Sequence, residues 1–288
     1  MPYKYQLHDE KTKFEENLEI LKERKGHEVF LGWPGITYSE SENRGLMEKL
    51  EALDIRVERF IIDKTGYEDY LSKVRYKKKF PKYYSFNFPE KTLEYYLAYT
   101  LIAPSKGEVF VDIAAENSPH YKEFEKLSGA RGYKQDLMYK PGIRGREIGG
   151  DASGMPVSDN FFDKAFAACS LEHFEEESDI NFISEMGRAL KPGGKLVVLP
   201  LYLHKKPFVV TDPRYSVPGN VKFDEGIDIH CVETYQNRHG RFYSPETLNK
   251  RLILPNKDVF KFRVLYFENF RDIDKTVYCR FALEAVKK

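Results

Sequence analysis

The sequence lacks several features that would assign it to other protein classes. No apolar run approaches the length of a membrane span, and residues 1–10 contain no apolar core such as a signal peptide needs. The 46 lysines and arginines nearly balance the 45 aspartates and glutamates, so no net field steers the chain toward nucleic acid or membrane. The three cysteines are odd in number, far apart and never in a Cys-x-x-Cys pair. These absences predict a cytoplasmic protein with reduced thiols and no nucleic-acid or membrane partner.

The chain divides at a basic and aromatic stretch, residues 73–84. Before it, helical spacing around residues 14–21, 46–53 and 67–76 alternates with short strand patterns at residues 27–32 and 55–62. Residues 1–84 are therefore predicted to form an N-terminal α/β extension. We expect the basic stretch to be a solvated connector; its interleaved cations and rings leave phosphate binding open as an alternative.

From residue 85 onward, strands and helices alternate regularly. Strand patterns lie near residues 109–113, 130–137, 163–170 and 195–202, and helical patterns separate them. Strands joined by crossover helices must pair in parallel, so a parallel sheet covered on both faces is expected. Two further strands, at residues 260–267 and 276–286, predict an antiparallel hairpin at the end of the chain. A long insert, residues 203–240, separates this hairpin from the rest.

Three phrases in this region carry chemical information. The first strand runs into Asp112, and the turn after it ends at Ser118 and Pro119, which suit the start of a helix with free backbone N–H groups. A second phrase runs from Gly150 and Asp151 through Met155 and Pro156 to Asp163, and a third places Lys-Pro-Gly-Gly before a strand at residue 195. Together these phrases resemble the class I S-adenosylmethionine (SAM)-dependent methyltransferases.

The resemblance covers about residues 85–288. It implies an α/β fold, namely a Rossmann-like seven-stranded, mostly parallel sheet with a C-terminal antiparallel hairpin, and SAM as the cofactor. Its glycine-rich loop, however, is replaced here, because Ala114, Glu116 and Ser118 stand at the three glycine positions. Since glycine permits positive φ, we expect Ala114 to lie in an ordinary backbone region. The departure leaves two interpretations open: a SAM-dependent enzyme, or a non-catalytic binding module that keeps the fold but has lost SAM.

Cofactor contacts are expected at the strand ends, where open α/β sheets bind ligands. Asp136 follows Asp112 at close to the spacing of about 20 residues at which an acidic side chain meets a ribose diol; capping its own loop is the alternative. The resemblance places the adenine edge at Asp151 and Ala152. The predicted cofactor-binding residues are Asp112, Ala114, Glu116, Asn117, Ser118, Asp136, Leu137, Asp151, Ala152 and Ser170.

Histidines are the candidate general bases. His173 follows the fourth strand, where the resemblance places donor and acceptor, although it could equally cap the next helix. His204 and His230 in the insert are further catalytic candidates; their spacing matches no metal motif, so no metal is predicted. We predict O-methylation of a small hydroxylated substrate, such as a sugar or glycan unit, or a phosphorylated molecule. Residues 1–84 and 203–240 would form its cover.

Overall fold

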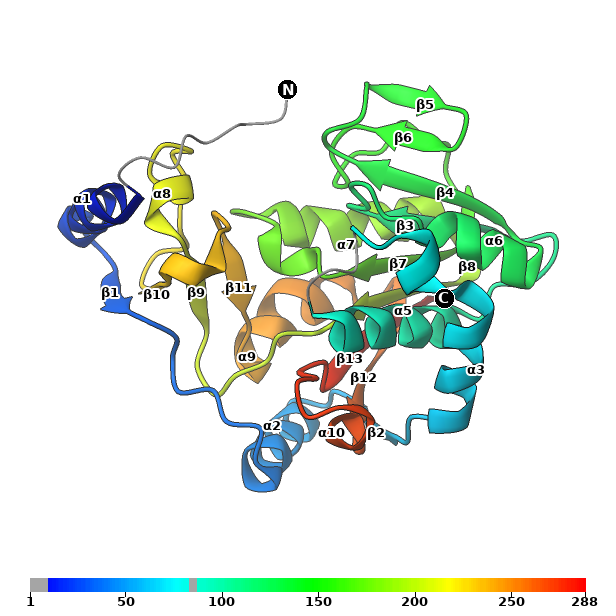
Figure 1. Cartoon of the computed structure of the whole chain (residues 1–288), viewed down its shortest axis with the longest axis horizontal. Helices are drawn as coiled ribbons and strands as arrows, with labels where there is room; N and C mark the ends of the chain where they lie inside the picture. The colour runs from blue at the N-terminus through cyan, green and yellow to red at the C-terminus, as the bar shows by residue number, and fades with distance from the viewer. Residues whose placement is uncertain (1–9, 83–86) are drawn as a thin grey trace.

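Two β-sheets organise the protein, of which the computed structural model describes residues 10–82 and 87–288. A large sheet with helices on both sides forms the body, and a small sheet lies beside it at the left of Figure 1. In the described part of the chain, no helix is both long and apolar enough to cross a membrane.

The large sheet has nine strands in the order β2-β12-β13-β8-β7-β3-β4-β6-β5. Their bounds are β2 Val57–Phe60, β12 Phe260–Phe267, β13 Phe281–Lys287, β8 Leu190–Leu199, β7 Phe162–Ala168, β3 Val109–Ile113, β4 Arg131–Asp136, β6 Glu147–Gly149 and β5 Gly142–Arg144. All neighbours pair in parallel except β13 with both of its neighbours and β5 with β6. The predicted mostly parallel sheet with a C-terminal antiparallel hairpin is confirmed. It has nine strands rather than seven, because β2 pairs with β12 and β5 pairs with β6 at the two edges.

Helices cover both faces of this sheet, as buried parallel strands require. On one face lie α2 (Glu40–Ala52), α7 (Ser178–Ala189) and α9 (Pro245–Leu248); on the other lie α3 (Lys64–Val74), α5 (Phe88–Ile102) and α6 (His120–Ser128). The short helices α4 (Tyr76–Lys79), α8 (Pro213–Ser216) and α10 (Phe270–Ile273) and helical turns at Leu171–His173, Glu233–Tyr235, Asn249–Ile253 and Leu254–Asn256 complete the elements.

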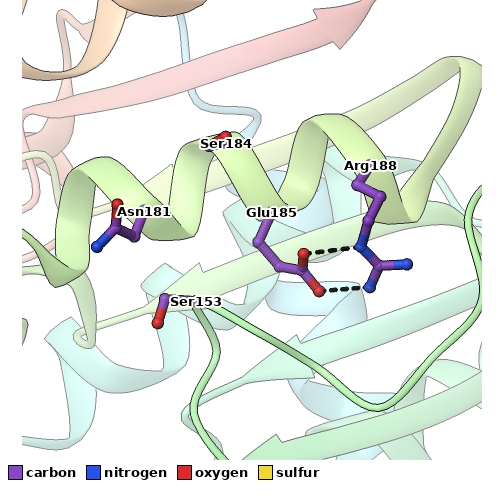
Figure 2. A pocket seen from close by; sticks show the side chains of 5 residues that line it. All are labelled: Ser153, Asn181, Ser184, Glu185 and Arg188. Atoms are coloured by element: carbon purple, nitrogen blue, oxygen red, sulfur yellow. Dashed lines mark hydrogen bonds and ion pairs between the residues drawn. The ribbon is translucent and has the colours of Figure 1, made fainter.

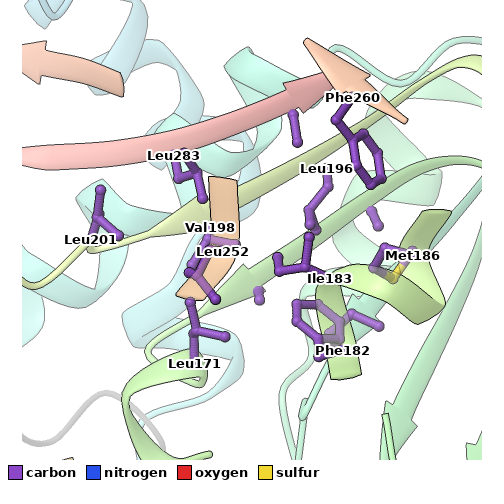
Figure 3. Packing of buried hydrophobic residues seen from close by; sticks show 14 of the residues in the cluster. Leu171, Phe182, Ile183, Met186, Leu196, Val198, Leu201, Leu252, Phe260 and Leu283 are labelled. Carbon is purple, nitrogen blue, oxygen red and sulfur yellow. The ribbon is translucent and has the colours of Figure 1, made fainter. Parts of the chain in front are cut away.

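Strand β8 is continuously apolar because both of its faces are buried. Leu196 and Val198 pack with Phe182 and Ile183 of α7, as Figure 3 shows. Side chains alternate along a strand, so the residues between them belong to the cluster on the α5 side. All of these side chains are at most 1 % exposed, and burial of each stabilises the fold by roughly 1.5–3 kcal/mol.

The small sheet combines the N-terminal region with the insert. Its order is β1-β10-β9-β11, with bounds β1 Glu28–Leu31, β10 Asp228–Cys231, β9 Phe208–Thr211 and β11 Gly240–Phe242. Helix α1 (Glu10–Glu23) covers it through Phe14, Leu18 and Leu21, the side chains whose spacing predicted that helix. The predicted N-terminal extension therefore contributes one strand to each sheet, since β1 pairs with β10 and β2 with β12.

The basic stretch packs more closely against the body than a solvated connector would. The chain turns at Arg75, whose φ is 59°, into α4, where Tyr76 is only 1 % exposed. Lys79 pairs with Glu123 of α6 at 2.8 Å. Tyr83 and Tyr84 lie outside the described residues. The prediction of a solvated connector is thus wrong for Tyr76, while it agrees with Lys77 and Lys78, which are both exposed.

Candidate functional site

The loop after β3 has the backbone of a glycine-rich loop without containing glycine. Ala114 has φ of 50° and Glu116 has φ of 46°. The expectation that Ala114 lies in an ordinary backbone region is therefore wrong. Because a Cβ atom disfavours this region, each residue costs about 1–2 kcal/mol. Contacts elsewhere in the fold must hold the loop in place.

Those contacts come from the end of β4. The side-chain oxygen of Gln135 accepts from the Ala114 N–H at 3.1 Å, and its carbonyl accepts from the Ala115 N–H at 2.9 Å. Asp136 Oδ2 accepts from the Glu116 N–H at 2.7 Å, and Asp136 Oδ1 from the Met138 N–H at 2.8 Å. Both oxygens of Asp136 thus cap backbone amides. A contact of Asp136 with ribose stays a prediction, and it would have to use the remaining lone pairs.

Asp112 is buried at the base of the same loop. Ser118 Oγ donates to Asp112 Oδ2 at 2.8 Å and accepts from the N–H of His120 at 3.2 Å, which links the end of β3 to the start of α6. Burial raises the pKa of Asp112 to about 8, and the neighbouring Asp136 acts in the same direction, against the opposing effects of Ser118 and Lys134. Asp112 is therefore mostly protonated at neutral pH, an internal hydrogen-bonding group of the loop.

A cavity of about 280 Å³ opens beside this loop. It is lined by Ala114, Gln135, Leu137, Asp151, Ala152, His173, Phe174, Glu175, Ser178 and Arg238. Four of the predicted cofactor residues, Ala114, Leu137, Asp151 and Ala152, are among them. Asp151 Oδ1 accepts from both the backbone and the hydroxyl of Ser153, and in the described part of the chain nothing bonds to Asp151 Oδ2, which stays available to a ligand.

The other predicted cofactor residues do not line this cavity. Asp112, Ser118 and Ser170 are buried beneath it, and Ser170 Oγ donates to the carbonyls of Ala168 and Ile113 and so ties β7 to β3. Glu116 and Asn117 are exposed. Sequence reasoning missed the contributions of Gln135 and of Arg238 to this cavity. Gln135 precedes the predicted Asp136 at the end of β4, so the expectation of contacts at strand ends could have included it.

Helix α7 holds the segment that follows Asp151. Glu185 accepts from the Met155 N–H at 2.8 Å, and Arg188 donates to the Val157 carbonyl at 2.8 Å. Figure 2 shows Glu185 and Arg188 joined by two interactions, beside a hollow that Ser153, Asn181 and Ser184 also line. The two charged groups pair with each other and bond to the backbone of the loop, so we assign them a supporting role in the fold.

A second and larger cavity, of about 670 Å³, adjoins the first. Its walls come from the N-terminal region, the start of α5, the end of β7, the segments before β9 and β13, and the insert. The lining residues are Trp33, Pro34, Ile36, Tyr38, Asn87, Lys91, Cys169, Glu172, His173, Tyr202, Thr234, Tyr235, Asn237, Phe242 and Tyr278. Among the described residues, His173 alone lines both cavities.

Backbone groups of the insert orient His173. Its Nδ1 lies 2.6 Å from the carbonyl oxygen of His239, and its Nε2 lies 3.4 Å from Asn237 Nδ2 and 3.6 Å from Glu172 Oε1. His239 is itself buried, and its Nδ1 lies 3.0 Å from the Glu172 carbonyl. Burial, reinforced by Arg241, lowers the pKa of His239 to about 3, so its ring is neutral.

The structure does not bring the other two histidine candidates to either cavity. His204 bonds to the Lys206 backbone, and His230 stacks on Phe30 in the small sheet with ring centroids 5.0 Å apart. Within residues 10–82 and 87–288, no group of three or more His, Cys, Asp or Glu side chains is placed to hold a metal ion.

Comparison with known proteins identifies the central part of the chain. Residues 111–198, which run from β3 into β8 and include the loops of the first cavity, match the methyltransferase domain family. Residues 111–198 thus carry a methyltransferase domain of this family. A ubiquinone/menaquinone biosynthesis C-methyltransferase, UbiE of Stutzerimonas stutzeri (strain A1501), is 30 % identical to it over 139 residues, 43 % of this chain and 48 % of the relative. The chain thus spans about half the length of that curated relative.

Solved structures similar to this methyltransferase domain are more distant in sequence. The 1,6-didemethyltoxoflavin-N1-methyltransferase of Burkholderia thailandensis is 14 % identical with a TM-score of 0.43, over 81 % of this chain and 94 % of that one. A SAM-dependent methyltransferase from Mesorhizobium loti is 13 % identical with a TM-score of 0.44, over 66 % of this chain and 95 % of that one.

Proposed function

We propose that the chain is a SAM-dependent methyltransferase that acts on a small hydroxylated molecule. The observation that carries the proposal is the position of His173, which lies between a cavity formed mainly by the loops of the methyltransferase domain and a larger cavity to which the N-terminal region, α5 and the insert also contribute. Methyl transfer requires donor and acceptor to meet in line, and much of the rate comes from this positioning.

The first cavity fits the adenosine end of SAM. Asp151 Oδ2 can accept from an exocyclic amine, and Leu137 and Ala152 provide apolar walls. Ala114 and Glu116 have positive φ, so the loop keeps the backbone conformation that glycines would give it. The absence of the glycines therefore does not by itself close the cavity. When bound, SAM supplies a methyl group on a reactive sulfonium.

His173 is the proposed general base. Because a backbone carbonyl only accepts hydrogen bonds, the short contact with His239 fixes the proton on Nδ1 of neutral His173. Nε2 then carries the lone pair, which can accept a hydroxyl proton. In the structure Asn237 Nδ2 donates to this lone pair across 3.4 Å, so the hydroxyl of an acceptor would take the place of that long contact.

The second cavity is the proposed acceptor site, with residues 33–38 and the insert as its cover. Oxygen is the proposed acceptor atom, in a sugar, a glycan unit or another hydroxylated molecule. Carbon is a second candidate, since the relative from Stutzerimonas stutzeri is named a C-methyltransferase. A phosphorylated substrate has less support, because the lysines of the basic stretch lie outside the cavity lining.

Calorimetry and thermal unfolding with S-adenosylhomocysteine test the proposal. At about 100 times the dissociation constant, bound ligand should stabilise the protein by about 2.7 kcal/mol and raise the melting temperature by roughly 5–10 °C. Asp151→Asn should weaken binding, whereas Asp258→Asn, on an exposed turn, should not. No heat and no thermal shift at millimolar ligand would contradict the proposal and favour a non-catalytic binding module.

A further inference from the structure

Lys91 is the cation of the acceptor cavity. Its Nζ lies 2.7 Å from Cys169 Sγ and 3.4 Å from Glu94 Oε2, and Cys169 in turn donates to Glu94 at 3.0 Å. The Glu94 side chain is wholly buried, whereas the Lys91 side chain is 30 % exposed. The ammonium group therefore lies between a buried carboxylate and the cavity. The described residues provide partners for two of its three hydrogens, which leaves one for a ligand.

The groups around Lys91 affect its protonation and that of one another. They keep the ammonium charged, and most of the neighbouring acidic groups keep their protons. The titratable groups near it are Glu90, Glu94, His120, Cys169, Glu172, Tyr202, Tyr278 and Cys279. Burial lowers the pKa of His120 and raises that of Cys279, so both are neutral. Burial raises the pKa of Cys169, Tyr202 and Tyr278, so these side chains keep their protons. Burial, together with Glu94, also raises the pKa of Glu90. Burial raises the pKa of Glu172, against the effect of His173.

For Lys91 itself, two effects oppose each other. Burial works to lower its pKa, but the hydrogen bond that it donates to the Cys169 thiol and the charge of the Glu94 carboxylate act in the other direction, and the pKa of Lys91 is raised. Glu94 balances the charge from behind, away from the cavity. A ligand that enters the cavity thus meets the ammonium first.

Aromatic rings form the walls around this cation. They belong to Trp33, Tyr38, Tyr202, Tyr235, Phe242 and Tyr278. The Tyr202 ring centroid lies 4.9 Å from that of Phe242 and 6.2 Å from that of Tyr278, and Trp33 meets Tyr235 edge-on at 5.7 Å. Such rings favour a planar ligand, with about 0.5–1.5 kcal/mol for each ring pair. A saturated polyol brings many hydroxyls that need partners, whereas a phenol brings few.

We infer that Lys91 anchors the acceptor by binding an acidic hydroxyl, phenolic or enolic, of a planar ring as its oxyanion. This inference rests on the proposed function for the role of the cavity, and it narrows the acceptor from hydroxylated molecules in general to this class. Lys91 thereby selects an acceptor whose hydroxyl can ionise. A sugar alcohol does not ionise near neutral pH, so it cannot bind to Lys91 as an oxyanion.

The chemical step is an ionisation. The O–H bond of the hydroxyl breaks, its electron pair stays on oxygen, and the proton passes to His173 Nε2 or to the buffer. An ammonium within a few ångströms of the oxyanion favours the charged form, because opposite charges attract more strongly where water is displaced. Cys169 and His173 both lie directly after β7, so an oxygen held at Lys91 stays close to the proposed transfer site.

The test uses 4-nitrophenol, whose phenolate is coloured, and needs neither cofactor nor turnover. With excess protein, we expect the absorbance titration midpoint of the bound probe to fall by at least about one pH unit, a tenfold preference for the phenolate. Above that midpoint, calorimetry should show that 4-nitroanisole, which cannot ionise, binds at least about tenfold more weakly. An unshifted or raised midpoint, or equal affinities, would overturn the inference even if SAM binding and turnover were established.

Matched variants assign the effect to Lys91. In Lys91→Met the midpoint should return to its value in buffer, and in Lys91→Arg most of the shift should remain. Lys257→Met, which removes an exposed cation outside the cavity, should leave the shift unchanged. A shift that persists in folded Lys91→Met would contradict the inference. If Lys91→Met does not fold, the comparison of the two probes on the wild-type protein decides.

Discussion

His173 Nδ1 and the carbonyl oxygen of His239 lie 2.6 Å apart, although 66 positions separate the two residues in the chain. The contact joins the end of β7 to the insert, and it presents the opposite ring nitrogen to the junction of the two cavities. The proposed base is thus oriented by the same segment that covers the proposed acceptor.

The first prediction is a loss of turnover in His173→Ala. If His173 accepts the hydroxyl proton, methyl transfer should fall by about 10² to 10⁴, while affinity for S-adenosylhomocysteine stays within a few-fold, because the lost interaction is made in the transition state. Transfer of labelled methyl groups measures the effect. His230→Ala, outside both cavities, is the control and should retain turnover. Nearly full turnover in His173→Ala would show that positioning alone suffices.

The second prediction concerns Asp136. Asp136→Ala leaves the amides of Glu116 and Met138 without their acceptors, at about 1–3 kcal/mol for each amide that stays buried. We expect the free energy of unfolding to drop by roughly 2–4 kcal/mol in urea titrations. Unchanged stability combined with lost cofactor affinity would show instead that the carboxylate serves ribose alone.

The third prediction tests the glycine-like loop. Ala114→Gly should stabilise the protein by up to about 1 kcal/mol, because relief from the left-handed strain exceeds the entropy that glycine adds to the unfolded chain. Ala115→Gly, one residue on and not left-handed, should destabilise it by about 0.5–1 kcal/mol. Chemical denaturation of the two variants measures both effects, and the same sign for both would be inconsistent with the strain.

The fourth prediction follows from the raised pKa of Asp112. The native state keeps this proton up to a pH of about 8, whereas the unfolded chain releases it near its ordinary value. Unfolding therefore releases a proton in this window, and stability should fall as pH rises from about 4 to 8, by up to about 1.4 kcal/mol per unit. Asp112→Asn should remove this part of the slope in urea titrations at several pH values. An unchanged slope would show that Asp112 is ionised.

The fifth prediction has the opposite sign. The pKa of His239 is lowered to about 3, so below about pH 6.5 the unfolded chain binds a proton that the native state does not. The resulting stabilisation is complete above that pH and is lost as pH falls toward 3. Between pH 7 and 5 the wild type should lose about 2 kcal/mol more than His239→Gln. Equal losses would place a charged or exposed ring at His239.

The body of the fold could be predicted from its sequence because its signals are local. The run from Leu196 to Leu199 is apolar without alternation, as a strand buried on both faces must be, and the first half of β12 alternates apolar and charged residues before it also becomes continuously apolar. In the small sheet only β1 gave such a signal, at residues 27–32, and nothing in the sequence pointed to its partner. The strands of this sheet are at most four residues long, and β1 finds its partner β10 about 200 positions away, so neither periodicity nor spacing reveals the pair.

The site was predictable in part for similar reasons. Asp151 and Ala152, which the second phrase singled out, line the first cavity, and their contact with a cofactor stays a prediction. The backbone of Ala114 could not be predicted, because hydrogen bonds from Gln135 and Asp136 override the preference of an alanine. The acceptor cavity did leave a signal in α5. Glu90, Lys91 and Glu94 interrupt a helix of mostly apolar residues, and the two glutamates are fully buried, as charged residues seldom are unless they are paired.

The pairing of β1 with β10 has a consequence for truncated forms of the chain. Because β10 lies between β1 and β9, a protein that begins after residue 39 would leave β10 as an open edge with unpaired backbone groups. Such edges associate with one another. Trp33, Pro34, Ile36 and Tyr38 would be lost from the acceptor cavity with the same segment. A shortened chain would thus self-associate through the sheet that borders the proposed acceptor cavity, so aggregation and loss of the proposed activity would have the same cause.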